Sequence, residues 1–204
     1  MTTGADIETA GPVGGDERRR QLIERAAELF NEAGYHQTSV EDVAEACGIR
    51  KPTLYHYFSG KDEILHSIHD EFITVLLTKQ EEREQAGGSA ADAIYEAMRD
   101  VLELMGTHPG YVRVFFEHQR DLNEASRAEI GEKHTRYQAS VERLFVRGAE
   151  AGEFRPVDAR LASLVLSGMC NWAYHWYQPD GPLSGEEIAR TFSAILVDGL
   201  EGDR

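Results

Sequence analysis

Apolar residues recur at three- and four-residue spacing along almost the whole chain, and this periodicity constrains the fold more than any other feature. No stretch alternates apolar and polar residues as a half-buried strand does, and no internal repeat is present. Glycines, prolines and Ser-x-x-Asp or Ser-x-x-Glu capping patterns separate the periodic segments. The sequence therefore predicts an all-α protein. The expected helices span about 18–33, 40–47, 52–58, 61–84, 89–106, 109–120, 124–151, 158–178 and 184–200.

Composition narrows the class of protein. The 204 residues carry a formal net charge of −15, and 41% of them are hydrophobic, enough to bury a core. Such an acidic chain does not coat nucleic acid non-specifically, because that mode needs many cations to neutralise phosphates. A small basic patch can still act locally. We expect both cysteines, Cys47 and Cys170, to be reduced and buried.

The N-terminal segment and the absence of long apolar runs bear on where the protein acts. Residues 1–15 are rich in glycine, threonine and acids and lack the pattern of a signal peptide, so we expect a disordered tail. No run of about 20 apolar residues exists, which predicts that nothing spans a membrane. We therefore expect a cytoplasmic protein.

One short segment differs chemically from the rest of the chain. From Gly48 to Lys61 there is no acidic residue, while cations, a threonine and aromatic rings gather there. A helix, a glycine turn and a second short helix form the layout of a helix-turn-helix, whose second helix enters the DNA major groove. Cations and hydroxyls on that helix reach base edges and phosphates. The residues predicted to contact DNA are Arg18, Arg19, Arg20, Thr38, Ser39, Arg50, Lys51, Pro52, Thr53, Tyr55, His56, Tyr57 and Lys61.

Plainer interpretations apply to several of these residues. Arg18–Arg20 open the first predicted helix, where cations oppose the positive end of the helix dipole, so another interaction must favour them there. We expect that interaction to be contact with DNA phosphates. A solvated basic patch is the alternative there and at the other cations. Tyr57 has two interpretations: contact with the DNA backbone, or packing within the protein. Leu54 and Phe58, four residues apart, are expected to be core residues.

The segment "TSVEDVAEACGIRKPTLYHYFSGKDEIL" resembles the DNA-binding head of TetR/AcrR-family transcriptional regulators, and the likeness covers about 18–66. The resemblance implies a helix-turn-helix head over 16–62 and a helical ligand-binding and dimerisation domain over 63–204. It also implies a regulator, by family habit a repressor, that binds an inverted-repeat operator in double-stranded DNA as a homodimer. A small-molecule effector would release it. The matching positions are Thr38, Ala44, Gly48, Ile49, Leu54, Tyr55, Tyr57, Phe58, Lys61 and Leu65.

The last two predicted helices carry broad apolar stripes. Such faces pair across a twofold axis into a four-helix bundle, and the resembling family dimerises through these helices. The alternative is that the stripes only fill the core of one chain. The stripe residues are Leu161, Leu164, Val165, Gly168, Met169, Trp172 and Trp176 on one helix and Ile188, Phe192, Ile195, Leu196 and Gly199 on the next.

We also expect an apolar pocket in this larger half, although each lining residue can equally be plain core. The segment from Gly152 to Leu183 is similar to that of family members that control fatty-acid or steroid breakdown and respond to acyl-CoA thioesters, which implies such an effector. The alternative is that the shared residues only end helices and form a dimer interface, without indicating the effector. The expected lining residues are Met98, Met105, Phe115, Phe116, Tyr137, Met169, Trp172 and Trp176, with His118, Arg120, Asn171 and His175 as polar groups.

No catalytic pattern is present. The chain has no H-E-x-x-H, no cysteine cluster, no glycine-rich phosphate loop and no G-x-S-x-G. We therefore expect no enzyme activity, no metal site and no cofactor. The alternative function is a helical small-molecule carrier or protein-interaction module that does not bind DNA. If the protein is a regulator, the long helix from about Lys61 to Glu84 is the expected lever between effector and DNA.

Overall fold

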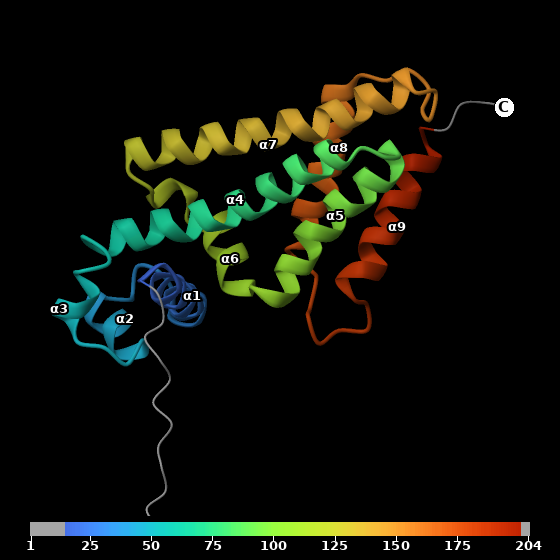
Figure 1. The fold of residues 1–204 in the computed structure, drawn as a ribbon. Helices are drawn as coiled ribbons and strands as arrows, with labels where there is room; N and C mark the ends of the chain where they lie inside the picture. Colours follow the sequence, from blue (N-terminus) through green and yellow to red (C-terminus); the bar gives the residue numbers. More distant parts are fainter. Residues whose placement is uncertain (1–14, 201–204) are drawn as a thin grey trace, which may run out of the picture.

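The structure, a computed structural model, describes residues 15–200, so the tail predicted for residues 1–15 lies outside the described residues except for its last one. Within that range every regular element is helical, which confirms the all-α prediction (Figure 1). The elements are α1 (Gly15–Ala33), α2 (Val40–Ala46), α3 (Lys51–Leu54), α4 (Lys61–Ala86), α5 (Ala90–Thr107), α6 (Pro109–Glu117), η1 (Gln119–Asp121, a 3₁₀ turn), α7 (Glu124–Glu150), α8 (Ala159–Ala173) and α9 (Gly185–Asp198).

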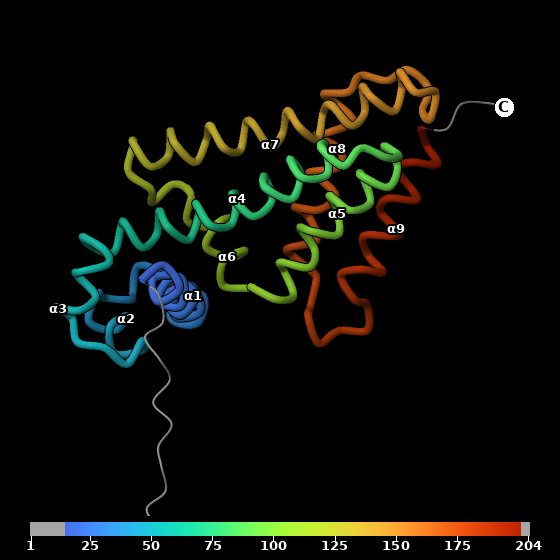
Figure 2. The backbone as a smooth tube through the Cα atoms, viewed as in Figure 1, coloured from blue at the N-terminus to red at the C-terminus, as the bar shows by residue number. Residues whose placement is uncertain are grey.

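Two long helices, α4 and α7, run side by side in the same direction and form the spine of the molecule (Figures 1 and 2). The helices α1, α2 and α3 gather at the start of α4, and we call this group the head. The remaining helices, which we call the body, continue from α4 toward the other end, with α9 packed along α5 and α8 against α7. The helix α6 lies between, in contact with both α1 and α4.

The head closes over large apolar side chains that the helical periodicity brings to its inside. Phe30, Leu54 and Phe58 are at most 2% exposed, which confirms the expectation that Leu54 and Phe58 are core residues. Burying each such side chain stabilises the fold by about 1.5–3 kcal/mol. Ile64 and Ile68 of α4 are fully buried in the same core. The domain boundary predicted at residue 62 thus falls inside α4, whose buried face continues from the head into the body.

The starts of α2 and α9 follow the predicted caps, whereas the cap predicted for Ser59 with Asp62 is not formed, because Gly60 precedes α4 without a side-chain cap. Three helices end earlier than expected. Ser39 and Ser184 form complete capping boxes at the starts of α2 and α9. The helix expected to reach residue 58 ends at Leu54, because the amides of His56 and Tyr57 bond three residues back in a tighter turn. The helix expected to reach residue 178 ends at Ala173 in a similar turn, and Pro179 then disfavours helical backbone at the preceding residue.

The helix α6 likewise ends at Glu117 instead of continuing to about residue 120, and a separate 3₁₀ turn follows. No helix within residues 15–200 has both the length and the apolar character that crossing a bilayer requires.

Candidate nucleic-acid interface and ligand cavity

The turn between α1 and α2 supports the outer surface of the head. Gly34 adopts φ +87°, a left-handed conformation that side-chain-bearing residues rarely adopt. The buried Tyr35 ring packs edge-on against Phe30, with centroids 5.1 Å apart. The Thr38 hydroxyl is buried and donates to the Gly34 carbonyl over 2.8 Å, and Ser39 accepts the Asp42 amide in the α2 cap. The hydroxyls of Thr38 and Ser39, both predicted to touch DNA, therefore already stabilise the turn and the start of α2.

The short helix α3 presents a coherent outward face. Pro52 lies in its first turn, where the missing amide proton costs nothing. Arg50, Pro52, Thr53, Tyr55 and His56 are exposed, with Tyr55 at 46%, while the inward side of the same helix is buried. Five of the residues predicted to contact DNA are thus brought together on one surface of the head.

The predicted DNA-binding cations differ in how they are already engaged. The Arg50 side chain forms no hydrogen bond or ion pair with any other residue between 15 and 200, and only its main-chain carbonyl accepts bonds, from Thr53 and Leu54. The Lys51 ammonium contacts the Glu41 carboxylate of α2, which raises the pKa of Lys51. Lys61 donates to the carbonyls of Tyr35 and Thr38 over 2.7 and 2.8 Å, and partial burial lowers the pKa of Lys61.

Lys61 therefore ties the start of α4 to the turn after α1. Tyr57, the residue with two interpretations, is half-buried beside Phe58, with ring centroids 6.4 Å apart. Its phenol has one side in the core and one at the surface, so the structure keeps both interpretations open.

The three arginines of α1 also divide. Arg19 donates to the Ser67 hydroxyl of α4 over 2.8 Å, and its guanidinium lies 4.9 Å from the centre of the Phe58 ring. Within residues 15–200, the hydrogen bonds of the Arg18 and Arg20 side chains are local to α1, with Gln21 and Glu17. Arg19 thus joins α1 to α4, whereas its two neighbours remain directed toward the surroundings of the head.

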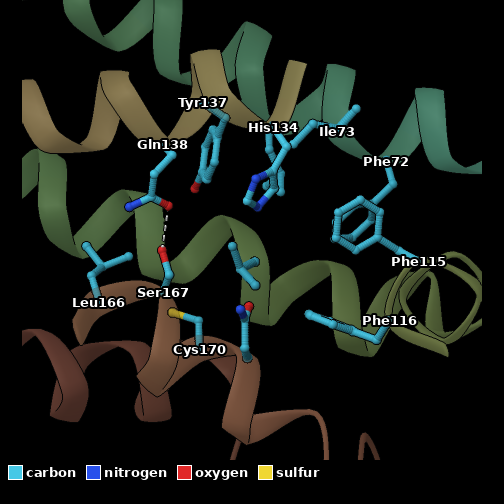
Figure 3. Close-up of a pocket in the computed structure, with 13 residues that line it drawn as sticks. Phe72, Ile73, Phe115, Phe116, His134, Tyr137, Gln138, Leu166, Ser167 and Cys170 are labelled. Atoms are coloured by element: carbon cyan, nitrogen blue, oxygen red, sulfur yellow. Dashed lines mark hydrogen bonds between the residues drawn. The ribbon is translucent and has the colours of Figure 1, made fainter. Parts of the chain in front are cut away.

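The body contains a small, mainly apolar cavity of about 40 Å³ lined by α4, α5, α6, α7 and α8 (Figure 3). Phe115 and Phe116 of α6 form one end, where Phe115 packs on Phe72 with centroids 4.4 Å apart. Tyr137 closes the cavity from α7. The lining residues are Phe72, Ile73, Leu76, Val101, Phe115, Phe116, His134, Tyr137, Gln138, Leu166, Ser167, Cys170 and Asn171.

Few polar side chains line this cavity, and one buried polar atom among them has no hydrogen-bond partner within residues 15–200. Gln138 is held by Ser163 and Ser167, at 2.8 and 3.1 Å (Figure 3 shows the second bond). Burial raises the pKa of the Cys170 thiol to about 12, so this cysteine stays protonated. The Tyr137 hydroxyl is buried and has no hydrogen-bond partner within residues 15–200. Because an unpaired buried donor is costly, this phenol is suited to an acceptor atom on a bound molecule.

The structure separates the residues predicted to line a pocket. Phe115, Phe116, Tyr137 and Asn171 line the cavity. Trp172 and His175 border a surface groove of about 420 Å³, which adjoins the cavity through Phe116 and Asn171. The remaining predicted residues lie elsewhere: Met98 in the core, Met105 beneath a cleft beside Tyr177, Met169 half-buried on α8, Trp176 exposed after α8, and His118 and Arg120 near η1.

The helix α6 joins the cavity to the head. A Cβ atom on Gly110 would lie 2.7 Å from the main chain of Ala27 in α1, so only glycine permits this approach. Arg113, one turn further along α6, donates to the Asn31 carbonyl at the end of α1 over 2.6 Å. The same helix then places Phe115 and Phe116 in the cavity wall. The helix α6 therefore contacts both the cavity wall and the head.

Comparison with protein families decides the class of this head and body. The family model described as bacterial regulatory proteins, tetR family, matches residues 22–68. The model described as tetracyclin repressor-like, C-terminal domain, matches residues 87–200. The chain belongs to the TetR family of bacterial regulatory proteins. This result confirms the resemblance inferred from the sequence and the helix-turn-helix head with a helical body, and it makes the chain a ligand-responsive DNA-binding regulator within a family of regulators rather than enzymes.

Three relatives illustrate the match over the whole chain. The HTH-type transcriptional repressor KstR2 of Rhodococcus jostii is 28% identical over 202 residues, covering 98% of each chain. The TetR-family regulator PfmR of Thermus thermophilus has a crystal structure with 31% identity and a TM-score of 0.82, covering 89% of this chain and 99% of PfmR. AibR in complex with isovaleryl coenzyme A and operator DNA has 28% identity and a TM-score of 0.78, covering 89% of this chain and 98% of AibR.

Several residues of these sites carry no signal that single-sequence reasoning detects. In the sequence, Gly110 follows Pro109 and indicates only a break between helices. Its contact with α1 involves residues about 80 positions away. Ile73 and Leu166 are unremarkable members of apolar stripes until the helices are assembled around the cavity. A glycine inside an amphipathic helix was the only available hint of close helix packing, and it does not name the partner.

Proposed function

We propose that this TetR-family chain represses transcription by binding an inverted-repeat operator as a homodimer, and that a short-chain acyl-CoA thioester releases it. A relative of nearly equal length, KstR2, is named a transcriptional repressor. The similar AibR forms a complex with isovaleryl coenzyme A and operator DNA. We propose no catalytic activity, and a regulator of chromosomal genes acts in the cytoplasm. The observation that carries the effector proposal is the apolar cavity containing the unpaired Tyr137 hydroxyl.

The exposed face of α3 supports the DNA-binding part of this proposal. A side chain that reads a base must be exposed and not already neutralised, and Arg50 meets both conditions. Thr53 and Tyr55 beside it offer a methyl group, hydroxyls and an aromatic surface to the groove wall. Lys51 has to exchange Glu41 for DNA, which lowers its net contribution to affinity.

The exposed face of α8 and α9 supports a dimer. Leu161, Trp172 and Ile195 are 60%, 66% and 62% exposed, although each is strongly apolar. An apolar patch of this kind on a charged protein marks an interaction surface. A second copy of the chain is the partner we propose, because two reading heads on one twofold axis match two half-sites of a palindromic operator.

The size of the cavity favours a short acyl group. About 40 Å³ holds one or two water-sized groups, far below the roughly 300–1,000 Å³ of pockets that enclose whole ligands. An acyl group must therefore displace Phe115 or Phe116, and the large CoA moiety stays in the adjoining groove beside Trp172 and His175. The thioester carbonyl is the acceptor for the Tyr137 phenol.

Displacement of the α6 rings explains how binding in the body reaches the head. Gly110 and Arg113 fix the other face of α6 to α1, so a shift of this helix changes the orientation of the head relative to the body. The predicted lever, α4, also passes through both parts and contacts α6. An effector that binds the shifted state more tightly than the DNA-binding state lowers the operator affinity. The ratio of its affinities for the two states limits the size of this effect.

Operator release by defined thioesters tests this proposal. Fluorescence anisotropy with duplexes from the promoter region next to the gene should show salt-sensitive binding at one palindromic site. Isovaleryl-CoA should release the DNA, whereas CoA and isovalerate separately should not. Substituting Tyr137→Phe should raise the isovaleryl-CoA concentration needed for release by about 2–10-fold, the value of one hydrogen bond, without changing operator affinity. Equal release by CoA alone, or unchanged release by the Tyr137→Phe variant, contradicts the assignment of the cavity.

A further inference from the structure

A cluster of metal-ligand side chains lies where the head meets the body, outside the cavity and outside the α3 surface. His36 belongs to the turn between α1 and α2, His118 ends α6, and Asp121 lies in η1. One ligand atom from each of the three residues can be chosen so that all lie within 4.8 Å of one another. The absence of an H-E-x-x-H pattern and of a cysteine cluster led us to expect no metal site. His36 and His118 are 82 positions apart in the sequence.

The geometry of this cluster is close to that of a coordination sphere. The His36 Nε2 atom lies 3.4 Å from Asp121 Oδ1, and His118 Nδ1 lies 2.8 Å from Asp121 Oδ2. Around a tetrahedral zinc ion with bonds of about 2.0–2.2 Å, neighbouring ligand atoms are separated by about 3.3 Å. The two separations involve different oxygens of Asp121. The first is close to the tetrahedral value, and the second must open by about half an ångström to admit an ion between the His118 imidazole and the carboxylate.

The surrounding residues hold these ligands in place. The buried Tyr35 ring packs against both imidazoles, with centroids 5.3 Å from His36 and 5.4 Å from His118. The side chains of His118 and Asp121 are 14% and 27% exposed, whereas that of His36 is 65% exposed. Two ligands are thus preorganised, and the third lies at the surface, where an ion from solvent reaches it.

We propose that His36, His118 and Asp121 bind a divalent first-row transition-metal ion, such as Zn²⁺, that links the head to the body. Two imidazoles and one carboxylate are donors that select such ions over Ca²⁺ and Mg²⁺, which prefer oxygen ligands. Water completes the coordination, since three protein ligands leave a position open. The ion would join the α1–α2 turn to the end of α6, the helix that also lines the cavity.

A second cluster, His66, Asp70 and Glu129, provides a matched comparison within the same chain. There the Lys133 ammonium contacts Asp70 and also donates to the Thr74 hydroxyl over 3.1 Å. A resident cation thus already neutralises this carboxylate, which makes it a poor ligand for a second positive charge. We therefore expect the His36 cluster, and not this one, to bind metal.

The test is a Zn²⁺ titration of the full-length chain without an affinity tag, in competition with a chromophoric chelator. We expect one Zn²⁺ per chain in the wild type, and binding at least about 10-fold weaker in the variants His36→Gln, His118→Gln and Asp121→Asn. The variant His66→Gln should bind as the wild type does. Circular dichroism and thermal unfolding without metal check that each variant is folded.

Three results would overturn the proposal. The first is an absence of stoichiometric binding by the folded wild type, which would leave the cluster as hydrogen-bonded side chains only. The second is equal affinity in the folded Asp121→Asn variant, since an amide is a much weaker ligand than a carboxylate. The third is loss of the ion in His66→Gln but not in His118→Gln, which would place the metal at the other cluster. None of these measurements requires DNA or an effector, so the outcome is independent of the proposed regulatory function.

Discussion

Arg50 and Lys61 flank the same short helix and carry the same charge, yet their side chains differ in the contacts that they make. The Lys61 ammonium is held by two main-chain carbonyls and lies 4.1 Å from the centre of the Tyr35 ring. Arg50 is exposed and makes no such contact within residues 15–200. A cation that already satisfies buried carbonyls stabilises the head, and only the other is available to a new partner.

We therefore predict that Arg50→Ala weakens operator binding by about 1–3 kcal/mol, or roughly 5–150-fold, because a bidentate contact with a base is lost. Fluorescence anisotropy at several salt concentrations measures this loss. The matched control is Arg136→Ala, an exposed arginine on α7 that pairs with Glu81, and it should leave operator affinity unchanged. Loss of equal size at every DNA sequence, with a salt slope reduced by about 0.9, would show that Arg50 contacts phosphate instead of a base.

His69 gives a second prediction at the residue level. Its imidazole is fully buried beside Phe115, and burial lowers the pKa of His69 to about 4. In the unfolded chain the same group has a pKa of about 6.5. As the pH falls below about 6.5, the unfolded state gains a proton before the folded state does. Stability is thus present above about pH 6.5 and is lost as the pH falls toward about 4.

The variant His69→Leu should lack this contribution. Between about pH 7 and pH 4 the wild type should lose about 3 kcal/mol more free energy of unfolding than the variant does. Urea unfolding at the two pH values, at one protein concentration, measures the difference. Carboxylates common to both proteins cancel in this comparison, so equal losses in wild type and variant would show that His69 does not titrate in this range.

At the level of helices, the sequence predicted those boundaries that are set by interactions between residues close together in the chain. The start of α2 and the start of α9 follow from Ser-x-x-Asp and Ser-x-x-Glu, which act within four residues. The end of α8 at Ala173 was missed, because the apolar pattern continues through Trp176 while the backbone turns. The sequence predicted only part of the cavity lining. In the sequence, Phe115 and Tyr137 have the same apolar periodicity as Met98, and only the packed structure shows that the first two line the cavity and the third lies in the core.

The contact between α6 and α1 is the element-level feature that most directly tests the structure. A methyl group at Gly110 would overlap the main chain of Ala27, and main chain cannot move aside as a side chain can. We predict that Gly110→Ala destabilises the protein by about 1–3 kcal/mol. The control is Gly131→Ala in α7, where nothing lies within 4 Å of the new methyl group. That variant should gain about 0.5–1 kcal/mol from helix propensity.

Chemical denaturation of the two variants measures both signs at once. If the Gly110→Ala variant is as stable as the Gly131→Ala variant, α6 does not approach the main chain of α1 as closely as the structure shows. A destabilised Gly110→Ala variant should also respond less to isovaleryl-CoA, because the helix that carries the signal is displaced before the effector binds.

For the whole molecule, the question is what covers the apolar face of α8 and α9. We predict that the wild type has twice the 22.8 kDa mass of one chain in light scattering, and that Ile195→Glu is monomeric, because a charge buried between two apolar faces has no partner. The control Val75→Glu places the same charge on an exposed valine of α4 and should remain dimeric. The monomeric variant should also lose specific operator binding, since a single reading head contacts only one half-site. A monomeric wild type, or a dimeric Ile195→Glu variant with normal operator affinity, would mean that the two heads are not joined through this face.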